Sequence, residues 1–345
     1  MRFSLLAALF LGVFGLATFG LFSLNVFRPV ENRFAGSCQP VLGVVGPEDF
    51  ALASNLGRAF VSSLNRREGP DARGAILSIA PDDPLDSGGW RDRTNGVPAK
   101  FRPAGLSYFE SGNVRRLFVV NRATRSIEIY DVERNGDLTH LKSFNERRLT
   151  NPVDVVAVGP DSFYISNNES SGGVIATLFE FATRATSGTV YYFDGLTTRV
   201  VADGLRFANG LAVNIDGSRL YVAETSGRAL KIFNRDAISG ALTYAHTEAM
   251  ENAVDKITVA ADGALWIAAH PKPISLARAR SKIDGASPSL VIRFVDMPGA
   301  EPAYSAVYSN DGEEISTASV AALVGRRLLI GSLLDNKYLV CQLGG

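Results

Sequence analysis

Five side chains with oxygen donors recur along the chain at wide, fairly even intervals, each beside an apolar run typical of a strand: Glu48, Asp49, Asp154, Asn209 and Asp255. The intervals correspond to one or two units of roughly 40–50 residues, a period typical of β-propellers. Because the inner strands of propeller blades converge on one axial channel, oxygens delivered once per blade would meet there. Calcium prefers such oxygen ligands. The pattern therefore predicts a propeller with a calcium site and an active site on its axis.

Six segments with alternating apolar residues predict the leading strands of six repeated units. They comprise residues 59–63, 117–121, 163–167, 220–224, 265–269 and 328–332. Most are followed by a second strand-like run, as at 127–130 and 229–233, and Gly, Asn or Asp stands at the breaks. Six such units predict an all-β fold, a six-bladed β-propeller. A β-sandwich is the alternative, but its strands would not recur in such long units.

The composition predicts a globular protein, and the first residues predict export. The 345 residues include 35 basic and 35 acidic side chains, and this balance argues against a nucleic-acid partner. Residues 3–27 are almost wholly apolar, which is long enough for a membrane span. We expect residues 1–27 to form a signal-anchor helix and 28–345 the propeller. A cleaved signal peptide is the alternative, and with either segment the propeller is exported to a periplasmic, extracellular or secretory-pathway compartment.

The two cysteines of the chain, Cys38 and Cys341, lie at opposite ends of the expected propeller. In an oxidising compartment two such residues are candidates for a disulfide bond. A propeller closes its ring where its first and last strands meet, which would bring the two ends together. Two unrelated buried thiols are the other interpretation.

Several motifs resemble those of the paraoxonase (arylesterase) family. They lie at residues 46–49, 151–160, 207–210, 254–257, 266–271 and 338–341, so the resemblance runs from Cys38 to near the C-terminus. It implies a six-bladed propeller that hydrolyses lactones and aryl esters with calcium in its central tunnel. It also implies a hydrophobic N-terminus and a disulfide bond between the chain ends.

The resemblance also implies two calcium sites. The ligands retained for a catalytic calcium ion are Glu48, Asn209 and Asp255, and those for a structural calcium ion are Asp49, Asp154 and the backbone carbonyl of Leu106. Val153 and Lys256 stand where the family has asparagine ligands of the catalytic ion. Lys256 either points away from that site, as the alternation of strand residues favours, or supplies its ammonium group in place of calcium.

The catalytic residues of the family are replaced in this chain. Ala104 stands at the position of the proposed catalytic histidine, and Arg122 at that of an assisting histidine. His270 follows a predicted strand and could reach the tunnel mouth, although a structural, hydrogen-bonded histidine is the other interpretation. No Gly-x-Ser-x-Gly elbow occurs, which argues against a serine nucleophile. Glu48 or Asp255 could instead activate a water molecule.

These observations predict a calcium-dependent hydrolase of small lactones or aryl esters, with metal-assisted attack of water in the central tunnel. Two alternatives remain open. One is a propeller without hydrolytic activity that binds a ligand or protein, since both family histidines are replaced. The other is a metal-free enzyme that uses Lys256, as in the strictosidine synthase-like propellers, which resemble this fold without calcium.

Overall fold

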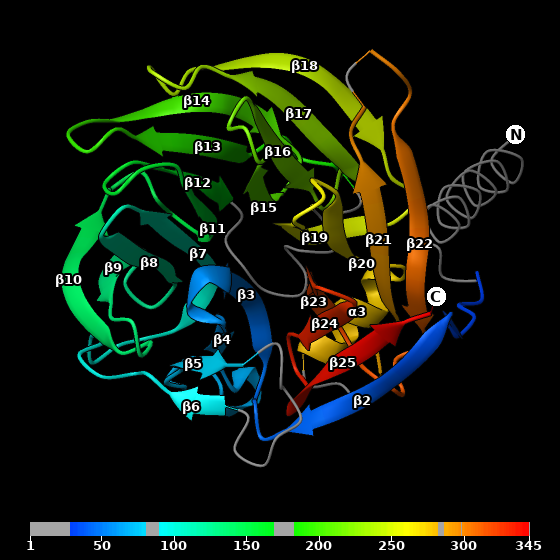
Figure 1. The fold of residues 1–345 in the computed structure, drawn as a ribbon. Coiled ribbons are helices and arrows are strands. Elements are labelled where there is room, and N and C mark those ends of the chain that lie inside the picture. The colour runs from blue at the N-terminus through cyan, green and yellow to red at the C-terminus, as the bar shows by residue number, and fades with distance from the viewer. Residues whose placement is uncertain (1–27, 81–89, 169–182, 282–285, 298, 345) are drawn as a thin grey trace, which may run out of the picture.

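The computed structural model describes residues 28–80, 90–168, 183–281, 286–297 and 299–344. Six antiparallel sheets stand around a common axis, and their first strands face that axis (Figure 1). This arrangement confirms the predicted all-β, six-bladed propeller.

Each of the first three blades is a four-stranded meander in chain order. The first blade comprises β3 (Pro47–Ala53), β4 (Arg58–Ser63), β5 (Ala75–Ile79) and β6 (Trp90–Asp92). The second comprises β7 (Pro103–Ser111), β8 (Val114–Asn121), β9 (Ser126–Val132) and β10 (Leu138–Asn145). The third comprises β11 (Pro152–Ala157), β12 (Phe163–Asn168), β13 (Gly188–Phe193) and β14 (Thr198–Leu205).

The last three blades lead back to the beginning of the chain. The fourth comprises β15 (Ala208–Val213), β16 (Arg219–Glu224), β17 (Ala229–Arg235) and β18 (Leu242–Ala249). The fifth comprises β19 (Ala253–Val259), β20 (Leu265–His270), β21 (Ser289–Val295) and β22 (Ala303–Asn310), with β1 (Arg33–Phe34) at its edge. The sixth comprises β23 (Ala318–Val324), β24 (Arg327–Ser332), β25 (Lys337–Leu343) and the N-terminal β2 (Gly36–Leu42).

The ring is closed by strands from both ends of the chain. β2 pairs with β25, and Cys38 lies directly opposite Cys341 in this pairing. A disulfide bond joins the two cysteines across 303 residues of sequence, which confirms the predicted bridge. In the chain-entropy account, closing so long a loop stabilises the fold by about 5–6 kcal/mol.

The six segments expected to lead the blades are in fact their second strands. Residues 59–63, for example, lie in β4, whereas β3 precedes them at the axis. The second strands have the clearest apolar pattern because they are buried between neighbouring blades: Phe118 of β8 and Phe163 of β12 stack with ring centroids 5.3 Å apart. Burying one such side chain contributes about 1.5–3 kcal/mol. The inner strands carry polar residues among small ones, so sequence periodicity marks them less clearly.

Two further segments bear on the site and on localisation. A short helix, α3 (Pro273–Arg280), lies between β20 and β21 and places its last residues near the axis. Within the described ranges no helix is both long and apolar enough to cross a membrane. The predicted signal-anchor helix, residues 1–27, lies outside the described residues.

Candidate functional site

The inner strands bring two rings of residues to the axis. In every inner strand the pairing with the second strand shifts register at this level, as a β-bulge does. Such bulges redirect side chains and are common beside functional sites. The first ring, in blade order, is Glu48, Ala104, Val153, Asn209, Asp255 and Ser319. The second ring is Asp49, Gly105, Asp154, Gly210, Lys256 and Val320.

Glycines in the second ring let neighbouring strands approach the charged residues. The Asp49 Oδ2 atom accepts a hydrogen bond from the Leu106 N–H at 2.7 Å, and Asp154 Oδ2 accepts one from the Leu211 N–H at 2.8 Å. A Cβ atom on Gly105 would stand only 2.1 Å from Asp154 Oδ1. Gly105 is therefore required by the close packing at the axis. A glycine at this position of an inner strand is a sequence feature that could have indicated the close approach of Asp154.

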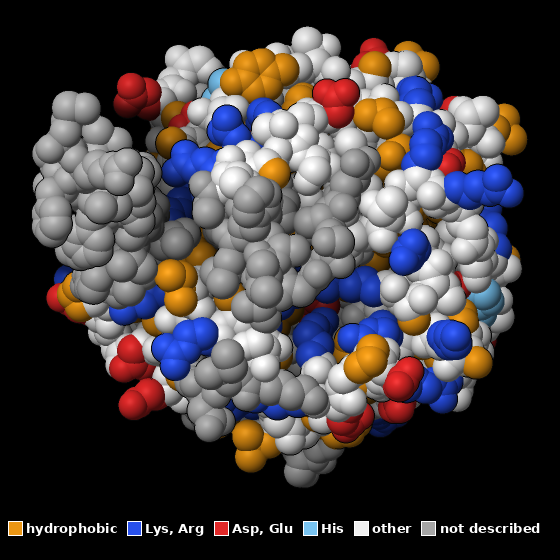
Figure 2. All heavy atoms as spheres, turned by 180° about the vertical axis from the view of Figure 1, so that it is seen from behind, with side chains coloured by type: hydrophobic (Ala, Val, Ile, Leu, Met, Phe, Trp, Pro, Cys, Tyr) orange, Lys and Arg blue, Asp and Glu red, His pale blue; other side chains and the backbone are white. Residues whose placement is uncertain are grey.

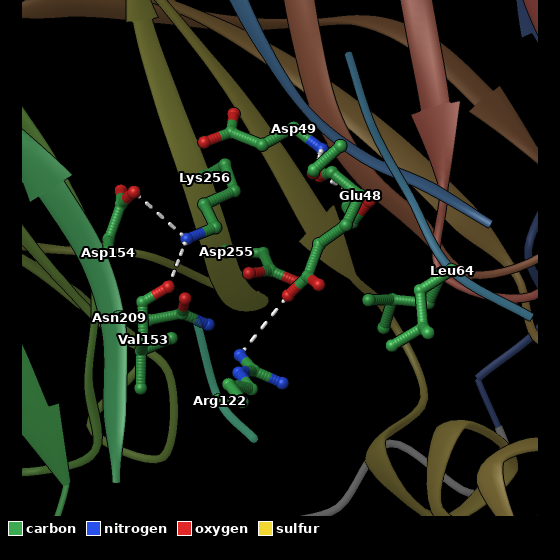
Figure 3. A network of polar contacts seen from close by, with 12 residues as sticks. Glu48, Asp49, Leu64, Arg122, Val153, Asp154, Asn209, Asp255 and Lys256 are labelled. Carbon is green, nitrogen blue, oxygen red and sulfur yellow. Dashed lines mark hydrogen bonds and ion pairs between the residues drawn. The ribbon is translucent and has the colours of Figure 1, made fainter. Parts of the chain in front are cut away.

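The ammonium group of Lys256 lies on the axis at the level of the second ring, beside Asp154 (Figure 3). Its Nζ atom is 3.0 Å from Asp154 Oδ1 and donates a hydrogen bond to the Val153 carbonyl at 2.8 Å. Only 1% of Lys256 is exposed. Burial by itself would lower the pKa of Lys256, but Asp154 and Asp49 outweigh it and hold the pKa above its usual value. The amine is therefore charged and serves as a fixed internal cation.

The residues of the implied structural calcium site do not fit a calcium ion. Asp154 is already paired with the Lys256 ammonium, and Leu106 meets Asp49 through its N–H, a donor, rather than through the expected carbonyl. A divalent cation beside a buried ammonium would be strongly repelled, because charges interact strongly where water is excluded. Lys256 thus occupies the position that the resemblance assigned to the structural ion.

Above this level the axis opens into a pocket of about 140 Å³. Its charged and polar lining residues are Glu48, Arg122, Asn209, Asp255, His270 and Arg280. Phe207, Leu276 and Leu333 add apolar surface. On the face opposite to that of Figure 1, Lys and Arg side chains gather around a hollow near the middle of the molecule (Figure 2). The structure thus brings together the three predicted ligands of the catalytic calcium ion.

Glu48 is held by two guanidinium groups, that of Arg122 at the position of the family's assisting histidine and that of Arg66, which no sequence motif indicated. Arg66 pairs with Glu48 Oε2, and the Arg122 Nη2 atom lies 3.1 Å from Glu48 Oε1. Burial would raise the pKa of Glu48, but Arg122 and Arg66 lower it. Burial in turn lowers the pKa of Arg66 to about 10. Arg66 comes from the short 3₁₀ helix after β4, a loop position with no recognisable motif.

Of the predicted ligands of the catalytic calcium ion, Glu48 is engaged by protein cations in this arrangement. Both Glu48 oxygens face arginines, and the Asn209 side-chain N–H donates to Thr225 Oγ1 at 3.0 Å. Among the described residues, no group of three His, Cys, Asp or Glu side chains is arranged to hold a metal ion. The three predicted ligands therefore share a pocket, but the Glu48 carboxylate is already paired with two arginines.

Asp255 and His270 form a buried pair at the wall of the pocket. The His270 Nε2 atom lies 2.8 Å from Asp255 Oδ2, and the two residues come from the adjacent strands β19 and β20. Since a carboxylate accepts hydrogen bonds, Nε2 carries the proton and Nδ1 keeps its lone pair. His270 Nδ1 is buried and has no hydrogen-bond partner among the described residues. This geometry is that of an imidazole oriented by a carboxylate and able to accept a proton.

The second-ring cluster of Asp49, Asp154 and Lys256 predicts a small effect for substitution of one aspartate and a large effect for the other. Burial and the nearby Asp154 raise the pKa of Asp49 well above its usual value. The folded state therefore binds the Asp49 proton more tightly, so ionised Asp49 destabilises the fold above the pKa of the unfolded chain. We expect Asp49→Asn to change the free energy of unfolding by less than about 1 kcal/mol and Asp154→Asn to lower it by about 3–5 kcal/mol, since only the latter leaves Lys256 unpaired.

Urea unfolding curves measured from about pH 7.5 to about pH 5.5 check this difference. Wild-type stability should gain from Asp49 as the pH falls, and Asp49→Asn should lose that gain. Equal destabilisation by the two substitutions would contradict the assignment of Asp154 as the partner of Lys256.

Comparison with known proteins agrees with this architecture. The family model described as Arylesterase matches residues 91–343. Serum paraoxonase/arylesterase 1 of Homo sapiens is 31% identical over 335 residues, which cover 93% of this chain and 92% of that protein. Serum paraoxonase/arylesterase 2 of Gallus gallus is 29% identical over 332 residues, with the same coverage.

Solved structures share the fold at lower identity. A gluconolactonase from Xanthomonas campestris is similar with a TM-score of 0.54 and 18% identity, covering 92% of this chain and 99% of that one. A luciferin-regenerating enzyme is similar with a TM-score of 0.59 and 12% identity, covering 89% and 95%. These structural similarities support the propeller fold. The family match and the sequence identity show which protein family the chain belongs to. The chain is a member of the arylesterase (paraoxonase) family.

Proposed function

We propose that this protein hydrolyses small esters or lactones in the axial pocket, with Asp255 and His270 activating the attacking water. The observation that carries the proposal is the Asp255–His270 pair, buried at 2.8 Å in the wall of a pocket that also contains arginines. Membership of the arylesterase family supports the reaction class. His270 thus offers a base in a chain whose family histidines are replaced by Ala104 and Arg122.

The reaction begins when His270 Nδ1 takes a proton from water as the water oxygen attacks the substrate carbonyl carbon. Asp255 stabilises the resulting imidazolium through its hydrogen bond to Nε2. When the tetrahedral intermediate collapses, the bond from the carbonyl carbon to the leaving oxygen breaks and the imidazolium returns the proton to that oxygen. The products are a carboxylic acid, which loses its proton to become a carboxylate, and an alcohol. When the substrate is a lactone, both groups remain on one molecule.

The developing negative charge on the carbonyl oxygen requires a positive partner. Arg122 lines the pocket, and its Nε atom is buried without a hydrogen-bond partner among the described residues. A fixed guanidinium group in a partly desolvated pocket stabilises an oxyanion through charge and hydrogen bonding. In this proposal Arg122 supplies the electrostatic contribution that the resemblance assigned to catalytic calcium.

Lys256 has a structural role in this proposal. Its ammonium group is buried at the level of the second ring and is held by Asp154 and the Val153 carbonyl. A charged amine with these partners is a poor nucleophile. We therefore place the chemistry at His270 rather than at Lys256, which was the predicted centre of a metal-free mechanism.

Two alternative functions compete with this proposal: hydrolysis that depends on calcium, and ligand binding without hydrolysis. Glu48, Asn209 and Asp255 line one pocket, which favours a calcium ion, whereas the arginine pairs of Glu48 oppose it. The loss of both family histidines favours a propeller that binds a small ligand without cleaving it. Each version gives a different outcome in one set of assays.

The assay follows hydrolysis of a panel of lactones and aryl esters by the full chain and by Asp255→Asn. Asp262→Asn is the matched control, since Asp262 is an exposed aspartate that pairs with Arg293 away from the pocket. We expect turnover by the wild type and the control and a large loss in Asp255→Asn. Absence of turnover above background across the panel, with and without calcium, would overturn the hydrolytic proposal.

We further propose export and membrane anchoring through residues 1–27, whose apolar composition carries this inference. Fractionation of cells that express the full chain tests it. Recovery with membranes after a high-salt wash is expected, and recovery in the soluble fraction would favour a cleaved signal peptide.

A further inference from the structure

The pocket contains a cation that the proposed reaction does not use. Arg280, the last residue of α3, lines the pocket, yet no hydrogen bond or ion pair with another described residue holds its guanidinium group. By contrast, Arg66 and Arg122 are both paired with Glu48. Arg280 therefore projects into the site without a partner of its own.

The electrostatics of the pocket favour an added negative charge near Arg280. Although the Arg280 residue is exposed, desolvation of its guanidinium group at the pocket lowers the pKa of Arg280, and repulsion from Arg122 lowers it further. Glu48 and Asp255 act in the opposite direction, but both are engaged with other partners. An anionic group on a ligand would relieve the repulsion between the two guanidinium groups.

We propose that the pocket recognises an organic carboxylate at Arg280, so that the preferred substrate is a small ester or lactone that carries an acidic group. The planar guanidinium group matches a carboxylate with two parallel hydrogen bonds. A pocket of about 140 Å³ suits a small molecule, and Phe207, Leu276 and Leu333 provide surface for its carbon skeleton. This inference rests on the proposed function for the ester bond but not for the binding of the acid.

Hydrolysis itself also creates a carboxylate, so the same chemistry has two sources. The charged group could belong to the substrate from the outset, or it could be the one that hydrolysis of a neutral lactone releases. In the first case Arg280 determines substrate choice, and in the second it determines how tightly the product stays bound. Kinetics and binding measurements separate the two.

The test compares two lactones of the same size, a γ-butyrolactone with a ring carboxylate and the corresponding carboxamide. We expect the wild type to prefer the carboxylate by about 10- to 100-fold in kcat/KM, the range of a charge-assisted hydrogen bond. Arg280→Gln should abolish most of that preference. Arg278→Gln is the matched control because it removes the same charge from an exposed position of the same helix that does not line the pocket.

Calorimetry with the γ-hydroxycarboxylate product provides a readout independent of turnover. Binding that is lost in Arg280→Gln but kept in Arg278→Gln supports the carboxylate site, even if no lactone is cleaved. Equal kcat/KM for the two lactones with product binding that needs Arg280 would assign the site to the product instead of the substrate. Hydrolysis of both lactones without preference and without product binding would overturn the inference while leaving the proposed function intact.

Discussion

Replacement of Lys256 by methionine is expected to lower the free energy of unfolding by about 3–5 kcal/mol, because it leaves Asp154 and Asp49 buried at the axis without a cation. Lys256 is the only cation that the described structure places directly against Asp154, at 3.0 Å. Methionine keeps most of the side-chain volume, so the change tests the charge more than the packing. Denaturant unfolding of both proteins at neutral pH measures the effect.

Two further variants separate the charge effect from a general effect of removing lysine. Lys142→Met removes an exposed lysine paired with Asp161 and should cost less than about 1 kcal/mol. Lys256→Asn restores the residue type of the family at this position, and we expect calcium to raise its midpoint of unfolding. A wild-type protein that calcium stabilises as much as Lys256→Asn would contradict the role of the ammonium group.

Replacement of His270 by glutamine is expected to lower kcat by about 10²- to 10⁴-fold, the usual contribution of a general base. Glutamine retains a hydrogen-bond donor for Asp255 but cannot take a proton from water. Steady-state assays with the best substrate of the panel provide the measurement.

The control for this experiment is His246→Gln, which alters a partly exposed histidine on β18 that pairs with Glu248. It should leave kcat unchanged. Thermal unfolding of His270→Gln shows whether the fold is retained. If this variant keeps wild-type kcat, the base must lie elsewhere in the pocket.

The fold could be predicted from sequence because second strands and turns repeat in every blade. The strand at 163–167 and the closing cysteines lie where the pattern placed them. The inner strands were harder to assign, since β7 and β15 carry glycines at the axis where a side chain would block the neighbouring strand. At these positions the need for close approach outweighs apolar alternation.

The site could be predicted only where one blade contributes one recognisable residue. Glu48, Asn209 and Asp255 meet in one pocket, as expected from their places on inner strands. The pairing of Arg66 with Glu48 could not be foreseen, because Arg66 lies in a loop and no local pattern relates it to the axis. Lys256 likewise reaches Asp154, two blades away, so its partner depends on the closed ring.

We infer that protein cations take the place of calcium on the axis of this propeller. Calcium titration of the chelator-treated full chain, with lactone hydrolysis measured in the same samples, tests it most directly. We expect no calcium binding in the micromolar range or tighter and turnover that chelation leaves unchanged. Tight calcium binding together with activity that chelation abolishes and calcium restores would contradict the claim.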